Sequence, residues 1–367
     1  MTGSKKYARC MVLAGGGFRF GIYLGMYAAA RDAGQRPDVL LATCGGAIAA
    51  AIIQSLPDDA QRKAWLASPQ MYRFCCDLQS SNQAGIVRAL GNAARRKLLG
   101  RSAHVVPDLF GDYLFDVPAT IPLPTPVVSP GQAEVALAIV GAKLLFKPED
   151  VLRPRAGRKL FAETVFCNPH TASLLQGMKA PWGDRRWGDH AIREDLVTDV
   201  SMPLADAVRI SISDCFYFRC HQHGSHSYTG GLVDLFPIEI SRQLADQTMM
   251  EFKQSFDQTF SIPAWRTVMG LDGNQRLRYV HGQFVDRWVD TSDVSKALAR
   301  QQVQKRLDWR SGRIRLVPPV DHATHVQHME DQWNYGYQRG MEACSRQQPP
   351  DISAMRQVDR YNRAEPA

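Results

Sequence analysis

The chain has 367 residues, is 45% hydrophobic and 22% charged, and carries a net charge of +8. This is an ordinary globular composition with ample length for a large core, as one domain with an insertion or as two domains. A positive net charge can favour anionic partners such as phospholipid surfaces or nucleic acid. The basic residues are scattered in short runs such as Arg95-Arg96-Lys97, with no aromatic-interleaved basic patch, so we expect no nucleic-acid partner.

The cysteines argue against a disulfide-rich secreted domain, and the apolar segments argue against a membrane-spanning helix. The eight cysteines show no C-x-x-C spacing and no framework of a small secreted domain, so we expect reduced thiols in a cytoplasmic protein. The longest apolar stretch, residues 133–146, contains Glu134 and Lys143 and is too short to span a bilayer. The polar residues 1–9 run into a strand without the pattern of a secretory signal.

The first part of the chain predicts a strand–helix–strand–helix unit. A buried strand at 10–13 is followed by three glycines, and a helix over about 21–33 ends before Gly34, a plausible C-cap. A second apolar strand at 39–41 leads into a helix that continues to Pro57. Such a unit predicts a parallel sheet that is covered by helices.

The rest of the chain is less regular. We expect helices within 57–101 and over 203–212, 240–248, 293–307 and 325–344, and a strand over 214–219. The segments 137–146 and 159–167 are either further strands or other core segments. We expect loops at 117–130 and 181–189, a histidine-rich turn at 221–226, and a poorly ordered polar tail at 345–367.

Cys44 stands at the junction between the second strand and the helix after it. Two glycines follow Cys44, and an Ala/Ile-rich segment comes next. This is the layout of a nucleophile elbow, in which a sharp turn raises one side chain above the sheet at the positive end of a helix. A cysteine at this place is either a small buried hydrophobe or a nucleophile for acyl transfer. At a helix N-terminus its pKa can be lowered, so that it acts as a thiolate.

Three ordered segments resemble the patatin-like phospholipase family: Gly15-Gly16-Gly17-Phe18-Arg19, Cys44 with its neighbours, and Thr229-Gly230-Gly231. In that family a glycine-rich turn donates backbone N–H groups to the oxyanion. A Gly-x-Ser-x-Gly elbow supplies the nucleophile, and an Asp-Gly-Gly turn supplies an aspartate that acts as base. The resemblance covers about 10–54 and 203–240.

The resemblance implies an α/β fold, a patatin-like three-layer sandwich with a mostly parallel central sheet and helices on both faces. We expect one such domain over 8–344, with an insertion at about 57–200. The family's substrates imply a lipid or acyl substrate. A cytoplasmic location compatible with peripheral membrane contact fits these expectations.

The sequence departs from the family pattern where the chemistry lies. Cys44 replaces the elbow serine, Ala42 the first elbow glycine, and Thr229 the dyad aspartate. Because backbone N–H groups survive side-chain changes, the resemblance still implies an oxyanion site at Gly15, Gly16, Gly17, Arg19 and Gly45. Thr229 cannot accept a proton near neutral pH, and losing a general base typically costs a factor of about 10² to 10⁴.

Other residues near these segments are candidates for the missing base. Asp234 lies one short turn beyond Thr229 and is the substitute that we single out, with turn capping as its alternative role. Asp214 precedes the same turn, and the histidines of 221–226 lie between the two aspartates. These histidines form either a solvent-exposed hairpin or, with Cys220, a metal site. Without a second ligand cluster we expect no metal and no cofactor.

Two functions of different classes follow from these observations. The first is an acyl hydrolase or acyl transferase that acts on lipid-type esters or thioesters, with Cys44 as nucleophile. The second is a catalytically silent relative that binds a lipid, an acyl group or a protein partner, because the departures cluster at the site. The distance from the Cys44 sulfur to the nearest carboxylate or imidazole separates the two hypotheses.

Overall fold

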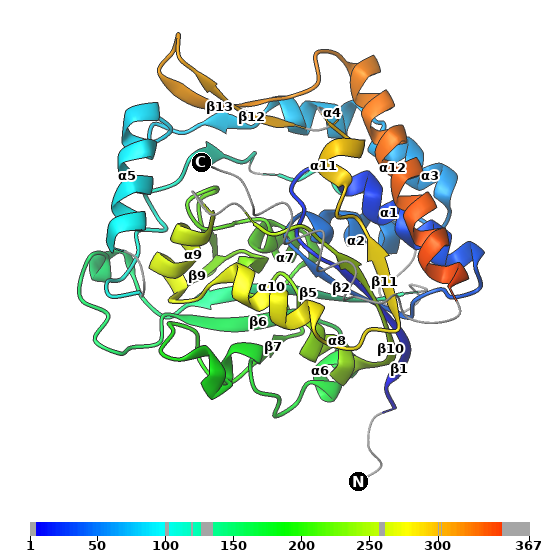
Figure 1. The fold of residues 1–367 in the computed structure, drawn as a ribbon, viewed down its shortest axis with the longest axis horizontal. Coiled ribbons are helices and arrows are strands. Elements are labelled where there is room, and N and C mark those ends of the chain that lie inside the picture. The colour runs from blue at the N-terminus through cyan, green and yellow to red at the C-terminus, as the bar shows by residue number, and fades with distance from the viewer. Residues whose placement is uncertain are drawn as a thin grey trace, which may run out of the picture.

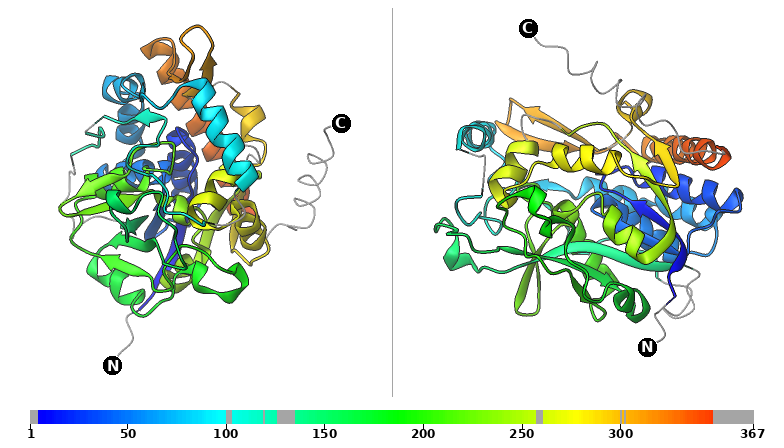
Figure 2. Two further views of the ribbon diagram at one scale, coloured as in Figure 1. Left: turned by 90° about the vertical axis from the view of Figure 1, so that its left-hand side faces the viewer. Right: turned by 60° about the horizontal axis from the view of Figure 1, so that its bottom comes forward.

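A mixed, mostly parallel β-sheet forms the centre of the protein, and helices pack on both of its faces (Figures 1 and 2). This is the α/β class that the sequence predicts. The structure is a computed structural model that describes residues 5–99, 103–118, 120–125, 135–256, 261–299, 301 and 303–346.

Within these residues the central sheet has nine strands: β1 (Tyr7–Leu13), β2 (Val39–Thr43), β5 (Ala136–Leu144), β6 (Phe161–Cys167), β7 (Val197–Asp199), β8 (His221–His223), β9 (His226–Thr229), β10 (Ala245–Phe252) and β11 (Arg287–Asp290). Their order is β11-β10-β1-β2-β5-β6-β7, and β9 pairs with both β5 and β8. Strands β11, β10, β1, β2 and β5 run parallel, whereas β6 is antiparallel to β5. Strands β5, β6 and β7 come from the predicted insertion, 57–200, and yet belong to the sheet.

The two faces of the sheet build two hydrophobic cores, because alternate side chains of a strand point to opposite sides. In β1, Met11 and Leu13 enter one core, and Cys10 and Val12 enter the other. The first core is covered by α1 (Phe20–Asp32), α2 (Gly45–Ser55), α3 (Asp59–Leu66), α4 (Pro69–Cys76), α7 (Leu204–Ser211) and α12 (His322–Ser345). The second is covered by α6 (Pro169–Leu174), α8 (Ile238–Leu244), α9 (Ser261–Met269) and α10 (Gly273–His281). The result is the predicted three-layer sandwich.

Helices α1 and α12 pack against each other at very close range. A Cβ atom on Gly25 would overlap the backbone of Trp333, and one on Gly336 would overlap the backbone of Ile22. Glycine on both helices therefore lets the two backbones approach. This contact holds the C-terminal helix over the helix that follows the glycine-rich turn.

Smaller elements lie at the rim of the sheet. They are α5 (Ile86–Leu99), α11 (Val294–Ala297), the two-stranded ribbon of β3 (Gln79–Ser80) with β4 (Phe115–Asp116), and the ribbon of β12 (Gln304–Asp308) with β13 (Arg313–Val317). None of the helices in the described part of the chain combines the length and the apolar character needed to cross a bilayer.

The strand predicted for 214–219 is wrong. The backbone N–H groups of Tyr217 and Phe218 both donate to the Asp214 carbonyl oxygen at 3.0 Å, which closes a turn instead. Phe216 in this turn has a positive φ of 62°. A run of aromatic residues favours a strand, but here the rings pack around a turn that carries Asp214 into the interior.

The helix predicted for 240–248 ends early. Helix α8 stops at Leu244, and the chain continues directly into β10, which pairs with both β1 and β11. The polar start of β10 at Asp246 and Gln247 is exposed, so its sequence resembles a polar helix face. Pairing on both edges outweighs the local pattern.

The polar helix predicted for 293–307 is also wrong. Its first residues form the single turn α11, and Gln304 begins strand β12. The helix predicted for 325–344 exists as α12 and starts earlier, because the Asp321 carboxylate accepts from the Thr324 N–H at 2.7 Å as an N-cap. Most of the predicted tail, from residue 347 on, and part of the predicted loop at 117–130 lie outside the described residues.

Candidate functional site

Cys44 lies between the end of β2 and the start of α2, in a strained backbone conformation with φ 48° and ψ −126°. A positive φ is rare for a residue other than glycine and typically marks a functional turn. The Cys44 N–H donates to the Ser211 hydroxyl at 2.9 Å, and that hydroxyl donates to the Val140 carbonyl oxygen at 2.7 Å. These bonds hold the turn against β5. The geometry is that of a nucleophile elbow.

The Cys44 sulfur has a carboxylate partner. Its Sγ lies 3.0 Å from Oδ2 of Asp214, and the other carboxylate oxygen accepts from the Leu232 N–H at 3.3 Å. Asp214 follows α7 on the turn that sequence analysis mistook for a strand. The nearest carboxylate to the thiol is thus one that we considered but did not choose as the substitute base.

Two glycines make room for this contact. A Cβ atom on Gly230 would lie 2.5 Å from Oδ1 of Asp214, and one on Gly231 would lie 2.9 Å from the Cys44 nitrogen. The Gly230 N–H also donates to the Ser213 carbonyl oxygen at 2.8 Å, which ties the two loops together. The glycine pair after Thr229 therefore serves the site although the residue before it carries no carboxylate.

The pKa values of the pair are both raised. Burial raises the pKa of the Cys44 thiol well above its ordinary value, and the Asp214 carboxylate raises it further. Burial raises the pKa of Asp214 to about 7, although hydrogen bonds from Cys44 and the Leu232 N–H oppose the shift. The expected lowering of the Cys44 pKa at the helix terminus is therefore wrong. A carboxylate with this pKa is well matched to accept a proton near neutral pH.

Thr229 and Asp234 lie elsewhere in the network. The Thr229 hydroxyl donates to the Ser213 carbonyl oxygen at 2.9 Å, so it braces the Asp214 loop. Asp234 is fully buried and pairs with the Arg276 guanidinium at 3.0 Å, and Arg276 also pairs with Glu239 at 2.5 Å. Asp234 therefore belongs to a buried ion-pair cluster, and the carboxylate beside the thiol is that of Asp214.

The glycine-rich turn lies directly against the elbow. A Cβ atom on Gly15 would come 3.0 Å from the Cys44 Cβ and 3.7 Å from its sulfur, and one on Gly45 would overlap the Gly17 carbonyl oxygen. Gly17 has a positive φ of 64°. Only glycine at these places allows the turn and the elbow to meet. Gly16 and Arg19 line the same cavity as the sulfur.

Lys253 is a residue of the site that sequence analysis missed. Its ammonium group donates to the Gly15 carbonyl oxygen at 2.6 Å and to the Tyr23 hydroxyl at 2.9 Å, and it pairs with Glu251 at 2.9 Å. Burial lowers its pKa. Because Lys253 directly follows β10, its place could be recognised only once that strand was identified.

A cavity of about 560 Å³ opens in front of the sulfur. Its volume is in the range of small-molecule sites. The charged residues that line it are Arg19, Asp214, Glu251, Lys253 and Lys305. Most of the remaining wall is apolar: Ile48, Phe74, Phe218, Leu232, Leu235, Phe256, Trp265, Val294 and Val303. Such a lining suits a hydrocarbon chain with its polar end at Cys44.

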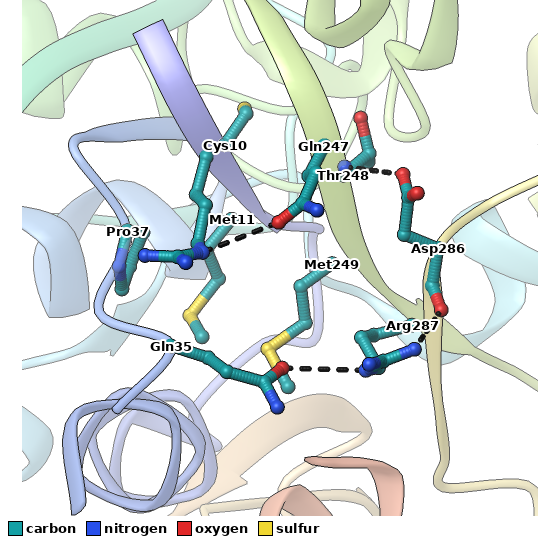
Figure 3. Close-up of a pocket in the computed structure, with 10 residues that line it drawn as sticks. Cys10, Met11, Gln35, Pro37, Gln247, Thr248, Met249, Asp286 and Arg287 are labelled. Carbon is teal, nitrogen blue, oxygen red and sulfur yellow. Dashed lines mark hydrogen bonds between the residues drawn. The ribbon is translucent and has the colours of Figure 1, made fainter. Parts of the chain in front are cut away.

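A second cavity of about 240 Å³ lies between the starts of β1, β10 and β11, at the opposite end of these strands (Figure 3). Its arginines are held by neighbouring amides: Arg9 donates to Gln247 at 3.2 Å, and Arg287 donates to Gln35 at 3.2 Å. Burial raises the pKa of Cys10 far above its ordinary value. This cavity holds no thiol paired with a carboxylate, so the larger cavity is the candidate active site.

The histidine-rich turn forms the β8–β9 hairpin. His221 and His223 both approach the Asp206 carboxylate, at 2.8 Å and 3.4 Å. Among the residues that the structure describes, no group of three or more His, Cys, Asp or Glu side chains is arranged to hold a metal ion.

The fold and the site together define an α/β protein with a nucleophile elbow beside a glycine-rich turn. A family model described as patatin-like phospholipase matches residues 11–242, which is more than half of the chain, and the chain belongs to this family of lipid acyl hydrolases. The protein is also similar to the structure of VipD from Legionella pneumophila, with 10% identity and a TM-score of 0.37, over 93% of this chain and 67% of that chain. A comparison with curated proteins finds no match.

Proposed function

We propose that the protein is an acyl hydrolase or acyl transferase for lipid-type esters or thioesters, with Cys44 as nucleophile and Asp214 as its base. The observation that carries this proposal is the 3.0 Å contact between the Cys44 sulfur and the Asp214 carboxylate. In this account the carboxylate at Asp214 takes the part that the family gives to the aspartate at the position of Thr229. The proposed base thus lies at a different sequence position from the family's aspartate, but it is still next to the nucleophile.

The reaction proceeds through a thioester. As the sulfur attacks the carbonyl carbon, the C–S bond forms and the thiol proton passes to Asp214. The carbonyl oxygen becomes an oxyanion that accepts from backbone N–H groups of the turn Gly15–Arg19 and of Gly45. The C–O or C–S bond to the leaving group then breaks, and Asp214 returns the proton to it. Water or an acceptor alcohol attacks the thioester with Asp214 again as base, which releases the acyl product and the thiol.

A base is required because the thiol is protonated at neutral pH. Burial and the nearby carboxylate both raise the pKa of Cys44, so no standing thiolate accumulates. The proton must therefore leave during the attack. Asp214 with a pKa of about 7 is ionised in a large fraction of molecules at this pH.

Hydrolysis of short-chain p-nitrophenyl esters and of an acyl thioester tests the proposal. We expect turnover by the wild-type protein and a loss of at least about 10³-fold in Cys44→Ala. Cys215→Ala is the matched control, because Cys215 lines the same cavity but its sulfur contacts the Thr229 hydroxyl at 3.4 Å and not a carboxylate.

Equal rates in the wild-type and Cys44→Ala proteins would contradict the proposal. Retention of a lipid or acyl ligand without turnover would favour the silent binder instead. Cys44→Ser alone, without a change at Thr229, should retain activity because the new hydroxyl would face Asp214.

A further inference from the structure

Helix α5 presents an apolar stripe to solvent. Val87 is 87% exposed, Leu98 is 85% exposed, and Leu90 and Ala94 between them are also exposed. The spacing of these four residues places them on one face of the helix. A helix on a protein surface normally turns such a face toward the core, so an outward stripe marks an interaction site.

The ribbon β12–β13 extends this apolar surface. Trp309 at its tip is 72% exposed, and Leu307 is exposed beside it. The ribbon is bonded to the start of α5, since the Ile86 N–H donates to the Gly312 carbonyl oxygen at 2.8 Å. Figure 1 shows the ribbon and α5 next to each other on one side of the molecule. We call these two elements together the α5–ribbon surface.

The two segments that form the α5–ribbon surface are rich in basic residues. Residues 86–99 and 304–317 contain nine Lys and Arg and one acidic residue, a net charge of +8. The whole chain has 44 basic and 36 acidic residues, so 35 of each remain elsewhere and cancel. Basic residues that are scattered in the sequence therefore meet on one surface. Arg88, Arg95, Arg306 and Arg310 are exposed there.

The same surface borders the cavity of the candidate active site. Val303 and Lys305, at the start of the ribbon, line the cavity, and the Lys305 ammonium lies 5.9 Å from the centre of the Tyr217 ring, which also lines it. On the other side, the Arg96 guanidinium lies 3.4 Å from the centre of the Phe216 ring, on the turn that carries Asp214. The α5–ribbon surface is therefore continuous with one wall of the cavity.

We propose that the α5–ribbon surface docks on an anionic phospholipid bilayer. An outward apolar stripe with a tryptophan would enter the boundary between headgroups and acyl chains, and the surrounding arginines would face the anionic headgroups. Nucleic acid offers no counterpart for an aliphatic stripe, and a protein partner does not require the cationic excess. This inference deepens the proposed function. It rests on that function only for the claim that the bilayer supplies the substrate.

Co-sedimentation of the full chain with vesicles tests the docking. The Cys44→Ala protein is used, so that no lipid is consumed, with vesicles of phosphatidylcholine alone or mixed with phosphatidylglycerol. We expect binding to the mixed vesicles that weakens at high salt. Val87→Glu and Trp309→Ala should each lower the partition coefficient about tenfold, and Arg88→Gln and Arg95→Gln about five-fold each.

Matched controls lie at the far end of the sheet. Phe284, 63% exposed, precedes β11, and the exposed Val200 follows β7. The strand directions place both at the end opposite Cys44. We expect Phe284→Ala and Val200→Glu to bind vesicles as the parent does.

Three results would overturn the docking proposal: equal binding to neutral and mixed vesicles, equal losses in the control variants, or a dimer in solution that Val87→Glu dissociates. Loss of the proposed enzymatic function gives a different pattern. In that case the wild-type protein hydrolyses no ester, and its binding to anionic vesicles persists.

Discussion

Asp214 and Asp234 lie twenty residues apart, and their surroundings give them different roles: Asp234 is fully buried, whereas Asp214 lines the cavity and is half-buried. Asp234 pairs with the Arg276 guanidinium at 3.0 Å. Within the described residues the Asp214 side chain contacts a thiol at 3.0 Å and a backbone N–H at 3.3 Å, both neutral groups. Burial raises the pKa of both carboxyl groups. For Asp234 the charge of Arg276 opposes the rise, whereas for Asp214, with a pKa of about 7, only hydrogen bonds from neutral groups oppose it.

The two carboxylates differ in whether a nearby positive charge balances them. Asp234 and Glu239 together balance the charge of Arg276, so removing one of them unbalances a buried cluster. Asp214 forms no ion pair with a cation within the described residues, so its removal from water costs stability and places its pKa near neutral pH. A carboxylate that lowers stability and lies beside a cysteine with a strained backbone is a candidate for function.

Removing the charge of Asp214 should have the largest effect on activity. Asp214→Asn keeps the shape of the side chain and removes the proton acceptor, so we expect kcat/KM for p-nitrophenyl esters to fall about 10² to 10⁴-fold. Asp234→Asn is the matched variant and should lose less than tenfold when assayed well below its melting temperature. Similar losses in the two variants would erase the distinction between the aspartates.

The opposite ranking is expected for stability. Asp234→Asn leaves Arg276 with only Glu239, and we expect a decrease of about 3 kcal/mol in the free energy of unfolding, measured by urea denaturation. Asp214→Asn should raise stability, and more so at pH 8 than at pH 5. The reason is that folding raises the Asp214 pKa from its ordinary value of 3.8 to about 7. The wild-type protein therefore loses stability as the pH rises from about 4 to about 7.

A double variant at Lys253 tests whether the bond from Lys253 to the glycine-rich turn contributes to catalysis. In Lys253→Met with Glu251→Gln the buried charges still balance, but the bond to the Gly15 carbonyl oxygen is lost. We expect kcat to fall about tenfold with KM nearly unchanged, because a shifted turn would stabilise the oxyanion less. Glu251→Gln alone is the control for the ion pair. A fall in melting temperature without any change in kcat would assign Lys253 a structural role only.

The smallest effect concerns Glu163, another buried carboxyl group. Neither of its carboxyl oxygens has a hydrogen-bond partner within the described residues, and burial raises its pKa well above the ordinary value. Glu163→Gln removes the ionisable group, so we expect a stability gain of about 1 kcal/mol. The gain should be larger at pH 8 than at pH 5, because the wild-type carboxyl opposes folding above its unfolded pKa of about 4.3. An equal change at both pH values in thermal unfolding would show that Glu163 does not titrate differently on folding.

The α/β fold and the elbow could be predicted from the sequence because they depend on local patterns. Apolar strands followed by glycines and an Ala-rich helix identify β1, α1, β2 and α2. The contact between Asp214 and Cys44 could not be predicted, because it joins residues 170 positions apart through a turn whose aromatic sequence favours a strand. Strand β10 was missed for a similar reason, since pairing on both edges decides its conformation. The roles of Glu251 and Lys253 in lining the cavity were missed with it.

The chemistry of the site also needed the structure. The sequence shows that Thr229 lacks a carboxylate, but not that its hydroxyl supports the loop that carries one. The clustering of positive charge was hidden in the same way, because 86–99 and 304–317 are far apart in the sequence and are brought together by long-range bonds such as that between Ile86 and Gly312.

The rate at which Cys44 is acylated, followed as a function of pH, tests the central claim most directly. Stopped-flow release of p-nitrophenol in the first turnover reports this step. For the wild-type protein we predict a rate that rises tenfold per pH unit below pH 7 and levels off above it, because Asp214 must be ionised and its pKa is about 7. In Asp214→Asn the inflection should vanish and the rate should fall at least about 10²-fold. An unchanged rate and inflection in Asp214→Asn would contradict the account.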